Sequence, residues 1–99
     1  NDLYKAISFS YFLKNKHNEI IGGDHSIAIP SIAHSLNNKK NLKVIYFDAH
    51  PDINSQKESK SKNIHGMPLA YLTGLEKEDD CFKSNCKYIE NYLKFENLL

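Results

Sequence analysis

The chain has 99 residues, of which 40% are hydrophobic and 25% charged, a composition typical of a soluble globular chain that forms at most one small domain. Its formal net charge is +1, and no basic stripe interleaved with aromatic residues predicts a nucleic-acid partner. No apolar run approaches the roughly 20 residues that a membrane helix needs, and no charged-then-apolar leader is apparent. These features predict a cytoplasmic protein without membrane contact.

The first half of the chain alternates helix and strand patterns. Apolar residues recur at helical spacing in residues 2–15, and residues 19–21 form a short apolar run that predicts a strand ending at a glycine turn. Ser26 is expected to cap a following helix whose apolar face contains Ile29, Ile32, Ala33 and Leu36. Residues 42–47 are rich in β-branched and aromatic side chains, which predicts a strand buried on both faces of a parallel sheet. This order of elements predicts an α/β fold.

The second half of the chain is less regular. We predict a polar loop at 51–63, a helix at 67–75, a charged linker at 76–87, the start of a helix at 88–93 and the opening of a strand at 98–99. Two central strands leave the faces and edges of a parallel sheet open to water. The chain is therefore expected to be part of a longer protein. Its two cysteines lack the spacing of a zinc ribbon or a redox motif, so we interpret them as thiols outside any disulfide.

The strongest chemical signal follows the predicted strand at 42–47. In an extended segment the side chains of Asp48, His50 and Asp52 project to the same side, at the end of the strand where open α/β sheets bind ligands. Two carboxylates and an imidazole suit manganese, iron or zinc better than calcium or magnesium. The alternative is a loop with a capping aspartate.

A second histidine stands at the corresponding place after the first predicted strand. If the two strands are neighbours in a parallel sheet, His25 reaches the metal bound by Asp48 and Asp52. Asp24 is either another ligand or a group that holds the turn and orients His25, and we favour the supporting role. The paired glycines at 22–23 are interpreted as a structural feature that allows a tight turn.

A third histidine, His65, precedes a glycine at the start of the predicted helix at 67–75. Hydrolysis with an amine leaving group needs a proton shuttle, and a histidine with a pKa near neutrality is suited to this role. The alternative is a capping or surface histidine. His17 and His34 are interpreted as structural or surface residues.

The three motifs together resemble those of the arginase and agmatinase (ureohydrolase) family. They read GGDHS at 22–26, DAHPDIN at 48–54 and NIHGMP at 63–68, and the resemblance covers most of residues 19–75. It implies that residues 1–99 are the N-terminal part of a three-layer αβα parallel-sheet domain, truncated before the family's second aspartate-rich metal motif. It also implies a homotrimer or larger assembly in the complete protein.

The resemblance assigns roles to individual residues. His25 and Asp52 would bind one Mn²⁺, His50 would bind the other, and Asp48 would bridge the two. A hydroxide held between two such metals, ~3.5–4 Å apart, is a nucleophile at neutral pH. His65 would take the position of the proton relay.

The residues after the second motif are similar to those of arginases, in which an asparagine and a serine hold the α-carboxylate of the substrate. These positions are Asn54 and Ser61, so the resemblance implies hydrolysis of L-arginine to L-ornithine and urea. The alternatives are agmatinase or another guanidino hydrolase, and a non-catalytic ureohydrolase homologue. Three lysines at 57, 60 and 62 are interpreted as solvated or, alternatively, as an aid to substrate capture. Without the second aspartate motif, the 99-residue chain alone is expected to be inactive.

Overall fold

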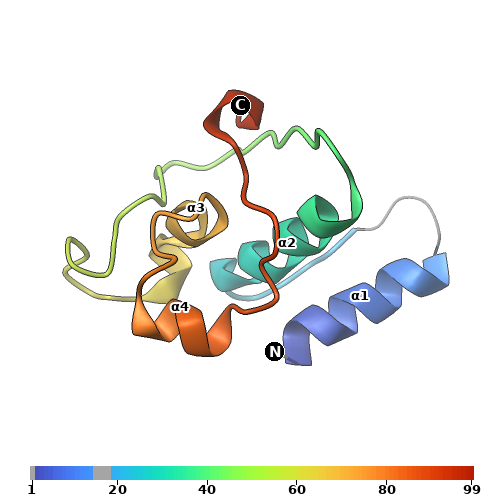
Figure 1. The fold of residues 1–99 in the computed structure, drawn as a ribbon, viewed down its shortest axis with the longest axis horizontal. Helices are drawn as coiled ribbons and strands as arrows, with labels where there is room; N and C mark the ends of the chain where they lie inside the picture. The colour runs from blue at the N-terminus through green and yellow to red at the C-terminus, as the bar shows by residue number, and fades with distance from the viewer. Residues whose placement is uncertain (1, 15–18) are drawn as a thin grey trace.

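The structure is a computed structural model that describes residues 2–14 and 19–99, except the side chains of residues 10–14 and Cys81. His17 therefore lies outside the described residues. The described chain is mainly helical (Figure 1). In chain order it contains α1 (Asp2–Lys14), η1 (His25–Ile27), α2 (Ala28–Asn38), η2 (Ile64–Gly66), α3 (Pro68–Leu72), α4 (Asp80–Asn85) and η3 (Phe95–Asn97).

The core lies between α2, α3 and the C-terminal third of the chain. Ile29 and Ala33 on α2 are buried, as the helical spacing predicted, while Ile32 and Leu36 are partly buried beside them. All five residues of α3 are buried, and Phe82, Cys86, Ile89 and Leu93 complete the cluster. Burial of this apolar surface is the main stabilising term in the fold. Cys86 is buried. The interpretation of the two cysteines as thiols stays a prediction, because the side chain of Cys81 lies outside the described part of the chain.

Helix α1 packs against α2, which confirms the helix predicted at 2–15. The hydroxyl of Ser8 and Nδ1 of His34 lie 2.9 Å apart, and the ring of Tyr4 stacks on that of Tyr88 with centroids 4.5 Å apart. His34 is buried at this helix contact, and burial lowers its pKa. His34 is therefore a structural residue, as the sequence indicated.

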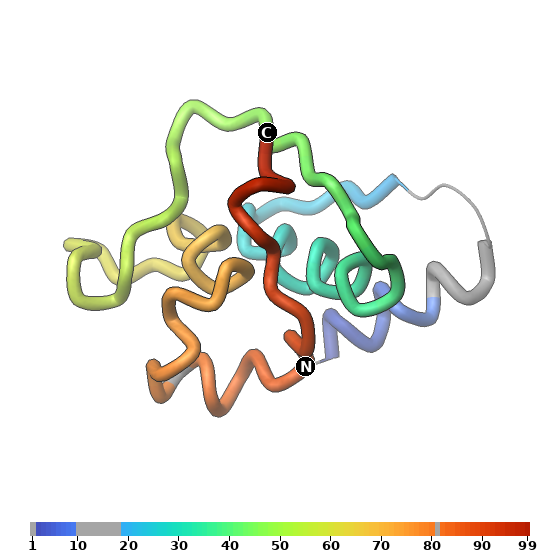
Figure 2. The backbone as a smooth tube through the Cα atoms, turned by 45° about the horizontal axis from the view of Figure 1, so that its top comes forward, coloured from blue at the N-terminus to red at the C-terminus, as the bar shows by residue number. Residues whose placement is uncertain are grey.

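The strands predicted at 19–21 and 42–47 are not formed within the described residues. A single parallel bridge joins Val44 to Leu98, with the amides of Val44 and Tyr46 donating to the carbonyls of Asn97 and Leu99 at 2.8 Å. Figure 2 shows the C-terminal segment lying beside residues 42–46. The expected strand opening at 98–99 is thus present as one bridge. Ile45 and Phe47 are 66% and 96% exposed, so the expected burial on both faces is not found here.

Residues 76–93 also differ from the prediction. The segment expected to be a linker contains α4, whose first turn is capped by Asp79, because the amide of Phe82 donates to its Oδ1 at 3.2 Å. The helix expected to begin at 88 does not form. Its amides are taken by other groups, since Glu90 and Asn91 donate to Oδ1 of Asn37 and Leu93 donates to the carbonyl of Leu72.

Two other predictions concern the middle of the chain. Residues 51–63 are a loop with one turn at 56–58, as expected, and the helix predicted at 67–75 is the shorter α3.

Across the part of the chain that the structure describes, there is no helix with the length and apolar character that crossing a membrane requires.

Candidate metal centre

His25 is held by a short turn at the start of η1. Oδ1 of Asp24 accepts the amide hydrogen of Ser26 at 2.9 Å. Hydrogen bonds from the side chain and the backbone of Ser26 lower the pKa of Asp24. The cap is therefore Asp24, and the prediction that Ser26 caps the helix is wrong, because the helical turn begins at His25, two residues earlier than a cap at Ser26 implies. The supporting role favoured for Asp24 is confirmed as far as the turn is concerned.

The two glycines before this turn have different roles. A Cβ on Gly22 would lie 2.8 Å from Cδ1 and 3.1 Å from Cγ2 of Ile27, so the Ile27 side chain would have to shift to admit a larger residue there. A Cβ on Gly23 would meet nothing within 4 Å. Of the pair, only Gly22 has a neighbour close enough for packing to favour glycine.

Asp52 is attached to the apolar core through its backbone. Its carbonyl accepts hydrogen bonds from the amides of Leu69 at 3.0 Å and Ala70 at 3.4 Å, in the first turn of α3. These amides have no partner within the helix, so Asp52 satisfies donors that burial would otherwise leave unpaired. Asp52 has a φ of 49° and is only 7% exposed. Its carboxylate is thereby held at the edge of the core.

Asp48 and His50 lie on a bend. Oδ1 of Asp48 accepts the amide hydrogen of His50 at 2.9 Å, and this hydrogen bond lowers the pKa of Asp48. The His50 side chain is 81% exposed, and its Nδ1 is 3.6 Å from Oδ1 of Asp48. The segment is not extended as expected, because of this bend and the left-handed backbone of Asp52. The side chains of Asp48, His50 and Asp52 nevertheless line the same pocket.

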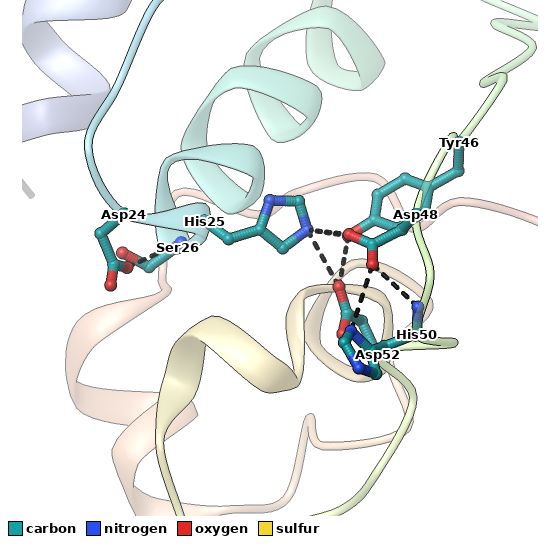
Figure 3. Close-up of polar contacts among 7 residues, drawn as sticks. All are labelled: Asp24, His25, Ser26, Tyr46, Asp48, His50 and Asp52. Atoms are coloured by element: carbon teal, nitrogen blue, oxygen red, sulfur yellow. Dashed lines mark hydrogen bonds and ion pairs between the residues drawn. The ribbon is translucent and has the colours of Figure 1, made fainter.

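The side chain that joins the two aspartates is His25. Its Nε2 lies 3.2 Å from Oδ2 of Asp48 and 2.9 Å from Oδ2 of Asp52 (Figure 3). Each of these three residues offers one ligand atom, and the three atoms lie within 4.8 Å of one another. One imidazole nitrogen and two carboxylate oxygens are a donor set that fits Mn²⁺, Fe²⁺ or Zn²⁺. The juxtaposition expected for His25 is therefore present.

Tyr46 is a member of this group that sequence reasoning did not identify. Its hydroxyl is 2.6 Å from Nε2 of His25 and donates a hydrogen bond to Oδ2 of Asp52 at 3.0 Å. Burial, followed by the nearby carboxylates of Asp52 and Asp48, raises the pKa of Tyr46. We interpreted this residue only as an apolar member of a strand. Its position two residues before Asp48 was the available signal, because residues two apart in a strand share a face.

A pocket of about 450 Å³ opens beside these residues. It is lined by all seven of the residues that the sequence singled out, which are His25, Asp48, His50, Asp52, Asn54, Ser61 and His65. Ser59, which was not singled out, also lines it. Nδ1 of His65 is 3.5 Å from Oδ2 of Asp24. The lysines at 57, 60 and 62 are exposed and do not line this pocket, which favours the solvated interpretation.

Comparison with known proteins identifies relatives along most of the chain. The sequence model described as the Arginase family matches residues 4–95. An arginase of Staphylococcus aureus (strain MRSA252) is 50% identical over 72 residues, which are 73% of this chain and 24% of the relative. The chain therefore spans about a quarter of the length of this relative.

Solved structures agree with the sequence matches. The crystal structure of arginase from Bacillus cereus aligns with 98% of this chain and 32% of its own, with a TM-score of 0.77 and 35% identity. Entamoeba histolytica arginase in complex with L-ornithine aligns over the same shares, with a TM-score of 0.72 and 34% identity. These likenesses support an arginase-like α/β fold. The described part of this chain is mainly helical and forms no strand beyond the bridge between Val44 and Leu98.

Proposed function

The chain belongs to the arginase family, and we propose that the complete protein is a manganese-dependent arginase that hydrolyses L-arginine to L-ornithine and urea. The observation that carries the proposal is the convergence of His25, Asp48 and Asp52 beside a pocket that Asn54, Ser61 and His65 also line. We place residues 1–99 in the N-terminal part of the arginase-like domain. The remaining carboxylate ligands would come from the part of the domain that follows these residues.

In this proposal His25, Asp48, His50 and Asp52 would hold two manganese ions. The donor set is the support, since imidazole and carboxylate groups already face one another. When bound, the two ions lower the pKa of water so that it becomes a nucleophile at neutral pH. His50 is the least organised of the four, because its side chain is 81% exposed.

The same proposal assigns the other pocket residues to the substrate. Asn54 and Ser61 donate hydrogen bonds to the α-carboxylate of arginine, and both side chains carry suitable donors. His65 carries the proton that the departing amine requires, and its Nδ1 lies 3.5 Å from Oδ2 of Asp24. We further propose a homotrimer or larger assembly in the cytoplasm.

Substrate preference in the complete protein tests the assignment of Asn54. Replacing Asn54 by Ala removes at least one hydrogen bond to a charged acceptor, worth roughly 1.5–3 kcal/mol. We expect kcat/KM for arginine to fall about tenfold to a hundredfold. Agmatine has no α-carboxylate, so its turnover is expected to change little.

Asn63→Ala is the matched control, because Asn63 is exposed on the same loop and does not line the pocket. This variant is expected to keep the wild-type preference for arginine. An equal fall with both substrates in Asn54→Ala would show instead that Asn54 supports the metal loop. Wild-type protein that prefers agmatine, or hydrolyses neither compound, would contradict the arginase proposal itself.

A further inference from the structure

We infer that Tyr46 is a positioning residue of the metal centre, whose hydroxyl donates a hydrogen bond to Asp52 and holds that carboxylate in its metal-binding orientation. The inference rests on the proposed function, because it concerns the same metal site. It adds a residue outside the DAHPDIN motif at 48–54, identified by its contacts in the structure.

The first support is the position of the hydroxyl. Oη of Tyr46 is 3.0 Å from Oδ2 of Asp52, the same oxygen that lies 2.9 Å from Nε2 of His25. Figure 3 shows the Tyr46 side chain extending from the segment that also carries Asp48 towards His25 and Asp52. The hydroxyl therefore touches a ligand oxygen of one residue and lies 2.6 Å from the ligand nitrogen of another.

The number of protons available decides the direction of these hydrogen bonds. A phenol has one hydrogen to donate, and an ionised carboxylate only accepts. The hydrogen of Tyr46 is used on Asp52, so the 2.6 Å contact with His25 is a hydrogen bond only in the tautomer that carries a hydrogen on Nε2. A carboxylate oxygen has more than one lone pair, so Asp52 could accept from Tyr46 and still act as a metal ligand.

The second support is that the backbone of Tyr46 is fixed from the opposite side. Its amide donates to the carbonyl of Leu99 at 2.8 Å, and the adjacent bridge pairs Val44 with Leu98. Asp52 is in turn fixed through its carbonyl, which accepts from the amides of Leu69 and Ala70. The hydrogen bond between the two side chains thus joins two anchored segments, and it limits rotation of the Asp52 carboxylate.

Manganese affinity of the complete protein tests the inference. Removing a group that orients a metal ligand typically lowers affinity 10–100-fold. Tyr46→Phe removes only the hydroxyl and keeps the ring. We expect Mn²⁺ titration followed by elemental analysis to show one of the two ions held about 10–100-fold more weakly, and the second ion much less affected. The melting temperature of the metal-free protein is expected to stay close to that of the wild type.

Tyr4→Phe is the matched control, since the Tyr4 hydroxyl accepts from Asn37 at 3.0 Å, outside the pocket. It is expected to leave Mn²⁺ affinity unchanged. A double-mutant cycle adds a second test. If Tyr46 acts through Asp52, Tyr46→Phe should cost nothing further in an Asp52→Asn background, because the oriented carboxylate is already lost.

Three results would overturn the inference. They are unchanged Mn²⁺ affinity in Tyr46→Phe, additive losses in the double variant, and loss of the fold in Tyr46→Phe, which would assign the hydroxyl to stability. Failure of the proposed function looks different, because the wild-type protein would then bind no manganese or leave arginine intact.

Discussion

The region around α2 and α3 and the segment from 42 to 63 are held in different ways. In the first, whole helical faces are buried against one another, and α3 is buried along its full length. In the second, one parallel bridge and a few side-chain hydrogen bonds hold a largely exposed chain. Packing therefore fixes the first region, whereas isolated contacts fix the second.

The pocket lies where the two regions meet, and its residues differ accordingly. Asp52 is tied to the first turn of α3 and is buried, whereas His50, two residues earlier, is exposed on the bend. A metal ligand needs an orientation fixed by neighbouring groups. The comparison teaches that closeness to the core, more than place in the motif, decides how well each ligand is oriented.

The largest expected effect is on the packed region. Leu72→Ala in the complete protein removes a fully buried side chain, and we expect the free energy of unfolding to fall by about 2–5 kcal/mol in urea titrations. Leu75→Ala is the control, because Leu75 is 56% exposed in the turns after α3. A similar loss of unfolding free energy in the two variants would contradict the difference between the packed and the loosely held region.

A smaller effect separates the two aspartates near His25. Asp48→Asn is expected to lower manganese affinity by more than about a hundredfold, since a bridging position needs a full carboxylate. Asp24→Asn is expected to cost about 10–100-fold, as is typical of a group that orients a ligand. Elemental analysis of dialysed protein measures both. Equal manganese contents would show that Asp24 is itself a ligand or that Asp48 does not bridge.

The smallest expected effect concerns His34, at the contact of α1 and α2. Burial places its folded-state pKa below 6.5, so the unfolded chain takes up more protons as the pH falls through that value. The stability gained from neutral His34 is complete above about pH 6.5 and declines as the pH falls towards the folded-state pKa. Urea titrations between pH 7.5 and 5.5 measure this decline.

His34→Gln should reduce that pH dependence, because the variant has no titrating group at this contact. An unchanged slope in His34→Gln would show that other groups control acid stability, and the buried role of His34 would need revision.

Local sequence patterns predicted the features that depend on local spacing. Helix α1, the apolar face of α2 and the polar loop at 51–63 were readable, because helical periodicity and polar runs are properties of short segments. The motifs and the family resemblance together indicated the seven residues that line the pocket. The motif resemblance also indicated the family, which the match over residues 4–95 shows.

Tertiary contacts decided the rest. The run at 42–47 has the composition of a central strand, yet strand formation needs backbone partners, and the described chain offers only one bridge. The helix expected at 88–93 was prevented by hydrogen bonds to Asn37 and Leu72, residues distant in sequence. His25 and Tyr46 meet Asp52 because separate segments pack around α2 and α3, and no local spacing encodes such a meeting.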